Sequence, residues 1–132
     1  MVQERGDLDV EAIGADIADV VPDTAAEVPR AAWSDWCRST SDDRQGRPLI
    51  LRFADVALGQ VRLAEGESFV AIEHDELGGS VALTIRYGDT VVPRRHVVAE
   101  PRHLFAEEDG DGHVRLIVVE DSTRRRTFVE LG

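Results

Sequence analysis

Apolar and polar residues alternate in short runs along most of the chain after residue 47. The alternation is clearest in residues 81–88, where Val81, Leu83, Ile85 and Tyr87 are separated by small or polar residues. A period of two places one side of the backbone in a core and the other in solvent, which is typical of antiparallel strands. The same pattern predicts strands over residues 48–56, 60–65, 68–75, 81–88, 90–99, 103–109, 113–121 and 123–131.

Residues that favour turns separate the predicted strands. Because no helical spacing interrupts the series, the pattern favours an antiparallel meander over alternating strands and helices. So many short strands are expected to curl into a half-barrel or small barrel. The predicted turns are Gly66-Glu67, Gly78-Gly79, Gly88-Asp89, Gly110-Asp111-Gly112 and Asp121-Ser122.

A helical spacing precedes the strands. Pro29 suits the first position of a helix, where its missing N–H is not needed, and Ala32, Trp33, Trp36 and Cys37 follow on one face. We expect the tryptophans to anchor the core and Cys37 to be a buried, unreactive thiol. The predicted fold class is α+β, with an N-terminal helix that closes an open side of a curved antiparallel β-meander.

The acidic residues concentrate at the start of the chain. Residues 1–28 hold eight acidic residues against one arginine, a net charge of −7 out of −11 for the whole chain, and no aromatic residue. This composition predicts an acidic tail that is disordered or only conditionally helical, followed by a single globular domain over residues 29–132. The apolar positions of one helical face in the tail are Val10, Ile13, Ile17 and Val20.

Composition excludes some functions. All fifteen basic residues are arginine, so Schiff-base chemistry and phosphate loops that need a lysine are excluded. No apolar run is long enough to span a bilayer. The start of the chain does not resemble a secretory signal, and Cys37 is the single cysteine, so we expect a cytoplasmic protein without disulfides.

Clustered arginines are the main candidate binding feature. If the last strand lies beside residues 94–102, their guanidinium groups would form a patch for a phosphate or a carboxylate-bearing partner. The alternative is a solvated face balanced by neighbouring acids. Nucleic acid is disfavoured by the net charge. The arginines concerned are Arg94, Arg95, Arg102, Arg124, Arg125 and Arg126.

Two histidines lie near the first arginines. Pro93 and Pro101 cannot donate ladder hydrogen bonds, so His96 and His103 are expected on an edge strand or on a broken one, exposed to solvent. Together with His113 they would form a metal set, but their spacing matches no established zinc pattern. We therefore predict no metal at these histidines.

Other segments match no complete metal-binding or catalytic motif. Residues 107–113 begin like a calcium loop, but its twelfth position falls on Val118 rather than on a bidentate glutamate, so we expect an acidic hairpin turn. No nucleophile elbow, dinucleotide fingerprint or phosphate loop is present. His74 has acidic neighbours, which leaves an acid–base role as one alternative. No cofactor is predicted.

From Pro29 onward the chain resembles a family of small bacterial proteins known only as a domain of unknown function. The resemblance implies no activity, cofactor or catalytic residue, and it sets the acidic tail and the arginine triplet apart as additions. It rests on Val28-Pro29-Arg30 followed by Trp33, on Gly46, on the spacing of His96 and Pro101, and on Asp121, Thr123 and Phe128.

These features lead to three functional hypotheses. The first is a non-catalytic binding or regulatory domain whose acidic tail lies over its own arginine patch, with a protein as the expected kind of partner. The second is a small hydrolytic enzyme that uses His74 or His96 with acidic partners in the mouth of the sheet. The third is an interaction subunit that docks on another protein through the amphipathic stripe of its tail.

Overall fold

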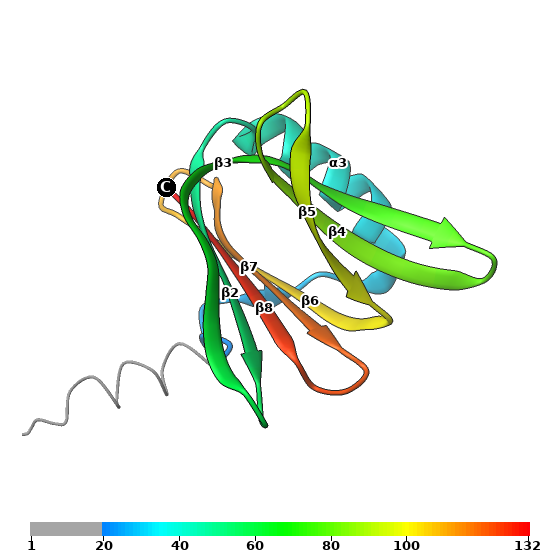
Figure 1. Ribbon diagram of the computed structural model, residues 1–132. Coiled ribbons are helices and arrows are strands. Elements are labelled where there is room, and N and C mark those ends of the chain that lie inside the picture. Colours follow the sequence, from blue (N-terminus) through cyan, green and yellow to red (C-terminus); the bar gives the residue numbers. More distant parts are fainter. Residues whose placement is uncertain (1–19) are drawn as a thin grey trace, which may run out of the picture.

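The computed structural model describes residues 20–132, apart from the side chain of Leu77 (Figure 1). Most of the predicted acidic tail, with its stripe at Val10, Ile13 and Ile17, therefore lies outside the described residues. The end of that tail is attached to the domain, because Val28 belongs to the core and residues 26–27 form a strand.

One α-helix and an eight-stranded antiparallel sheet make up the described chain. The strand order is β1-β6-β7-β8-β2-β3-β4-β5, so the sheet is open, with β1 and β5 at its edges, and no closed barrel forms. The helix follows β1 rather than preceding all strands. The elements are β1 (Ala26–Glu27), the 3-10 turn η1 (Arg30–Ala32), α3 (Trp33–Arg44), β2 (Pro48–Asp55), β3 (Gly59–Leu77), β4 (Ser80–Gly88), β5 (Pro93–Ala99), β6 (Pro101–Glu108), β7 (Val114–Asp121) and β8 (Arg126–Leu131).

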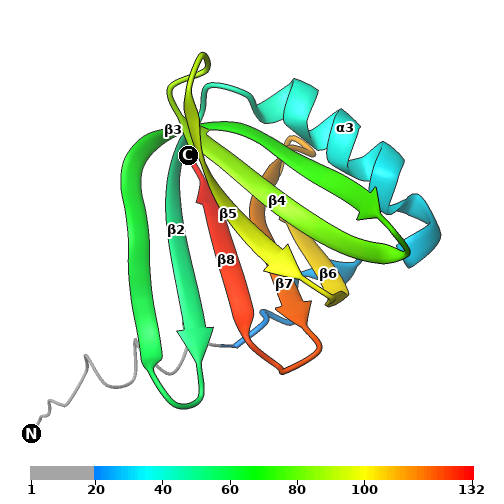
Figure 2. The same ribbon diagram turned by 45° about the vertical axis from the view of Figure 1, so that its right-hand side comes forward.

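Strand β3 is one long, bent strand where the sequence pattern predicts two strands and a turn at Gly66-Glu67. Its first half pairs with β2 as far as Ser68, and its second half pairs with β4 from Phe69 to Leu77. Gly66, with φ +81°, lies at a register shift in the β2–β3 ladder. The glycine therefore forms a bulge that bends the strand, and the bend carries β4 and β5 over the rest of the sheet (Figures 1 and 2).

The main core lies between the concave side of this sheet and α3. Trp33 is 1% exposed, and its Nε1 donates to the carbonyl of Val28 at 2.9 Å. Trp33 and Cys37 are both buried, as predicted, whereas Trp36 is only partly buried. Leu51, Phe69, Ile72, Leu83, Ile85, Leu104, Ile117, Val119 and Val129 are among the other core residues.

A second apolar cluster covers the outer face of the same sheet. Val118 and Phe128 are fully buried there, although their neighbours along β7 and β8 face the main core. The guanidinium group of Arg52 lies over the Phe128 ring, 5.2 Å from its centroid. Val21 packs on this cluster from the N-terminal segment, so the chain enters the domain across the outer face of the sheet. The cluster consists of Ala54, Leu116, Val118 and Phe128.

The bend at Gly66 leads to a test by substitution. A side chain at positive φ is strained, so we expect Gly66→Ala to lower the free energy of unfolding by about 1–2 kcal/mol. Gly110→Ala is the matched control, because Gly110 has open space around its Cα and no positive φ. Urea denaturation measures both variants. Equal stability of the two variants would contradict a strained bulge at Gly66.

Candidate functional site

The predicted arginine patch is divided by the strand order. Arg94 and Arg95 lie on β5, which pairs with β4, and Arg102 lies on β6. Strand β8, which begins at Arg126, pairs with β7 and β2 rather than with β5. Arg124 lies in the turn before β8. The sheet therefore separates Arg94 and Arg95 from the triplet at residues 124–126, whereas Arg102 lies near the β7–β8 turn, where Pro101 pairs with Asp121.

Half of these arginines have an ionic partner. The ion pairs are Arg94–Glu67, Arg125–Asp55 at 2.8 Å and Arg126–Glu120 at 3.5 Å. The other three, Arg95, Arg102 and Arg124, are exposed and form no ion pair within residues 20–132. Arg124 also lines a cleft.

This cleft, the arginine pocket, lies where the β2–β3 hairpin meets the β7–β8 turn. It encloses about 250 Å³ and is lined by Ala54, Asp55, Val56, Arg124 and Arg126. The pocket is small enough to hold one or two carboxylate or phosphate groups and too small for a drug-sized ligand.

Asp55 fixes the geometry of the arginine pocket. Its carboxylate accepts backbone N–H groups from Ala57 at 2.7 Å and Leu58 at 3.2 Å, and it pairs with Arg125. The hydrogen bond from Ala57, with smaller help from Arg125, holds the pKa of Asp55 below its usual range. Asp55 therefore stays ionised and neutralises Arg125, whereas Arg126 pairs with Glu120 and Arg124 has no ionic partner within residues 20–132.

The N-terminal segment joins the sheet beside the arginine pocket. Val21 packs on the outer apolar cluster, and Ala54 belongs both to that cluster and to the pocket lining. Residues 1–19, which precede this anchored segment in the chain, hold six acidic residues against one arginine. Sequence reasoning proposed contact between tail and arginines but missed the anchor at Val21.

The sequence predicts an exposed His96 on an edge strand, but the structure turns its side chain inward. Strand β5 is an edge, but His96 and Val98 lie on its inner face, which the bend in β3 turns toward β8. Its Nε2 lies 3.0 Å from Thr127 Oγ1, and its ring lies 5.8 Å from the ring of Phe53. Burial lowers the pKa of His96.

The other two predicted histidines lie apart from His96. His103 pairs with Glu27 at 2.8 Å, and His113 pairs with Asp43 at 2.8 Å. Each histidine thus has a different partner on a different element. Within residues 20–132 no three His, Cys, Asp or Glu side chains are grouped so that they could hold a metal ion.

The acidic segment at residues 107–113 comprises the end of β6 and the hairpin turn that leads to β7. The Asp109 carboxylate accepts the backbone N–H groups of Asp111 at 2.8 Å and His113 at 3.0 Å. Both groups bond to the same oxygen, Oδ1, and the segment forms an acidic hairpin turn, as the sequence pattern predicts.

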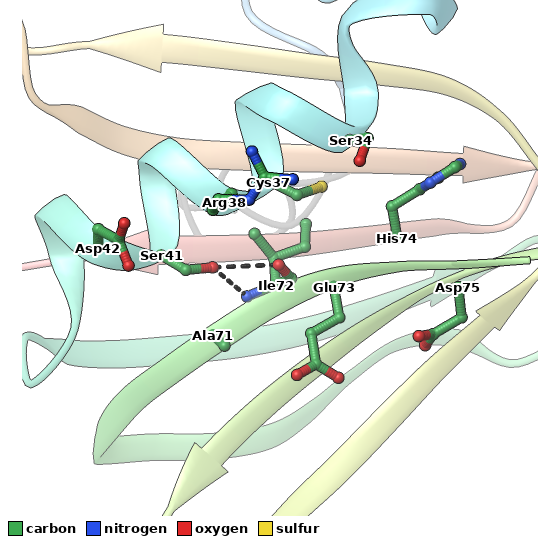
Figure 3. Close-up of a pocket in the computed structure, with 10 residues that line it drawn as sticks. All are labelled: Ser34, Cys37, Arg38, Ser41, Asp42, Ala71, Ile72, Glu73, His74 and Asp75. Atoms are coloured by element: carbon green, nitrogen blue, oxygen red, sulfur yellow. Dashed lines mark hydrogen bonds between the residues drawn. The ribbon is translucent and has the colours of Figure 1, made fainter.

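A second cleft of about 400 Å³ lies between α3 and the second half of β3 (Figure 3). His74 lies in it, with its ring 6.3 Å from the Trp33 ring. Burial is the main cause that raises the pKa of Cys37 to about 12, so this thiol stays protonated. The lining residues are Ser34, Cys37, Arg38, Ser41, Asp42, Ala71, Ile72, Glu73, His74 and Asp75.

The hydrolytic hypothesis depends on this second cleft or on His96. Among the described residues, His74 forms no hydrogen bond with Ser34, Ser41 or Cys37, the neighbours that carry a hydroxyl or thiol. Nucleophilic catalysis relies on such a pair of nucleophile and base. His96 does lie 3.0 Å from a hydroxyl, that of Thr127, but Thr127 is only 1% exposed. The enzyme alternative therefore stays a prediction.

The chain matches no protein-family model, no curated protein and no solved structure. The resemblance that begins at Pro29 accordingly stays a prediction. None of the helices within residues 20–132 combines the length and the apolar character needed to cross a bilayer.

The half-buried His96 predicts a loss of stability in acid. Because its pKa is lowered from 6.5 in the folded chain, the unfolded chain binds the proton more readily. We expect the free energy of unfolding to fall as the pH drops from 6.5 toward the lower pKa of the folded state. Urea denaturation at several pH values should show a smaller acid loss for His96→Phe than for the wild type.

His113 provides a control of opposite sign. Its hydrogen bond with Asp43 raises its pKa, so its contribution to stability is complete at low pH and is lost as the pH rises through that raised pKa. His113→Gln should therefore steepen the acid loss. If His96→Phe retains the full acid loss of the wild type, His96 is not the group responsible.

Proposed function

We propose that this chain is a non-catalytic binding module whose arginine pocket takes carboxylate groups from an acidic segment of a partner protein. Its own acidic residues 1–19 compete for the same pocket and regulate access to it. The observation that carries the proposal is the position of Val21, which packs on a cluster that shares Ala54 with the pocket. The proposed location is the cytoplasm, where Cys37 stays a free thiol.

Guanidinium groups suit this ligand. Their planar N–H donors match the two oxygens of a carboxylate. Arg124 has no ionic partner among the described residues, and Arg126 pairs with Glu120 at 3.5 Å. The ion pair between Asp55 and Arg125 holds the β7–β8 turn in place. The guanidinium groups of Arg124 and Arg126 therefore extend from a fixed backbone.

An acidic protein segment fits better than nucleic acid. The net charge of −11 repels a long polyanion, whose binding needs many phosphate contacts. The arginine pocket supplies two cations in about 250 Å³, enough for a local contact with one or two carboxylates.

Tethering makes the chain's own acidic segment an effective competitor. A short linker gives an effective concentration of roughly millimolar, so even a weak contact with residues 1–19 is populated. Such a contact weakens with added salt because its charges are exposed. A partner must therefore present more carboxylates, or hold them more rigidly, than the chain's own segment does.

The test uses a fluorescent peptide with the sequence of residues 1–19 and the full-length chain. Fluorescence anisotropy should show at least about tenfold tighter peptide binding to a chain whose own acidic residues are neutralised. High salt should abolish the difference. The neutralised positions are Glu4, Asp7, Asp9, Glu11, Asp16 and Asp19, each replaced by the corresponding amide.

Arginine variants identify the binding site. In the neutralised chain, Arg124→Asn should remove most of the peptide binding, and asparagine tolerates the positive φ of 69° at this position. Arg38→Ser is the control, because Arg38 is equally exposed but lies on α3, paired with Asp35. Equal peptide affinity of the wild-type and neutralised chains, or equal loss in the two arginine variants, would contradict the proposal.

A further inference from the structure

The edge of β3 that faces α3 has three successive hydrogen-bond partners along its length. Pairing with β2 ends at Ser68. Phe69 then exchanges backbone hydrogen bonds with the loop before β2, donating to the carbonyl of Arg47 and accepting from the N–H of Gly46, both at 2.8 Å. At Ile72 the partner is a side chain: Ser41 Oγ accepts the Ile72 N–H at 2.9 Å and donates to its carbonyl at 3.0 Å (Figure 3).

Beyond Ile72 the same edge presents His74 and Glu76. In an antiparallel strand the N–H and C=O of alternate residues point to the same side, and no register shift interrupts β3 between Ile72 and Leu77. The β3–β4 hairpin independently indicates that His74 and Glu76 point away from β4. Leu77 and Ser80 close the two-residue turn as a hydrogen-bonded pair, so the residues that bond to β4 alternate with His74 and Glu76.

No described group occupies this part of the edge. Within residues 20–132 the backbones of His74 and Glu76 form no hydrogen bond toward α3. Two N–H donors and two C=O acceptors therefore remain available. The cleft of about 400 Å³ lies alongside His74, with the buried side chains of Cys37 and Ile72 in its lining. An open edge beside a groove is the geometry that binds peptides by strand addition.

The charge of the cleft selects among peptides. Its lining carries three carboxylates, Asp42, Glu73 and Asp75, against the single cation Arg38, and Arg38 pairs with Asp35 at 3.3 Å. Glu73 is bonded to Arg86 and Asp75 to Thr84, whereas Asp42 has no ionic partner among the described residues. The arrangement favours a segment with a basic side chain that reaches Asp42.

We propose that the edge of β3 at His74 and Glu76 binds an extended, basic segment of a partner protein as an added strand. The added strand continues the series of partners that β2, the loop at Gly46 and Ser41 begin. Its backbone bonds to His74 and Glu76, and a lysine or arginine side chain pairs with Asp42. This site uses residues separate from the arginine pocket and does not rest on the function proposed there.

The test selects binders from a displayed library of random heptapeptides against the full-length chain. Selected peptides should be enriched in lysine or arginine and should shift the NMR amide signals of His74 and Glu76. Glu76→Pro removes an N–H that β3 does not use internally, so it should weaken binding about tenfold, as expected for one lost backbone hydrogen bond. Glu76→Ala is the matched control and should leave the affinity within about threefold.

The charge requirement is tested separately. Asp42→Asn should weaken the binding of the basic peptides. The bound peptides should still shift the NMR amide signal of His74. The proposal is overturned if no peptide is enriched, or if the enriched peptides bind Glu76→Pro as tightly as Glu76→Ala. It is also overturned if the amides of His74 and Glu76 shift with chain concentration alone, because a second copy of this chain would then be the occupant.

Discussion

The hydrogen-bonding demand of one bent strand organises this structure. The first half of β3 pairs with β2 and the second half pairs with β4, so each half has one edge without a strand partner. Unpaired backbone groups are costly when they are buried. The loop at Gly46 and the hydroxyl of Ser41 meet the demand at Phe69 and Ile72. They thereby hold α3 against the sheet and place Trp33 in the core.

The two candidate sites are the arginine pocket and the edge of β3. The first depends on where the N-terminal segment is anchored, and the second on which part of β3 lacks a partner. Val21 anchors the N-terminal segment on the outer face of the sheet, beside the arginine pocket. Beyond Ile72, the edge of β3 that faces α3 has no hydrogen-bond partner within residues 20–132. One site presents cations to carboxylates, and the other presents backbone groups and acidic side chains. A module with both would connect two partners of opposite charge.

Local patterns in the sequence predicted an element well where a single pattern, such as alternation or a glycine turn, determines it. Alternation located β4, and Gly78-Gly79 marked its hairpin with β3. Gly66 was misread as a turn because a glycine at positive φ serves a turn and a bulge equally. Only the pairing of β3 with two different strands distinguishes these, and that pairing is a long-range property.

The candidate site was predictable only in part for the same reason. The sequence singled out Arg124 and Arg126, but Arg94 and Arg95 lie on a strand that β8 does not pair with. Contacts that join distant segments, such as Asp55 with Arg125, leave no local signal. The inward orientation of His96 depends on the bend in β3, which no pattern near residue 96 reveals.

The most direct measurement is native-state hydrogen exchange of the backbone amides of β3, followed by NMR in the full-length chain. The account predicts slow exchange at Ile72, which Ser41 bonds, and at Glu73, which faces β4. It predicts fast exchange at His74 and Glu76. If His74 and Glu76 are protected as strongly as Glu73, the edge of β3 is closed and the account of this strand is wrong.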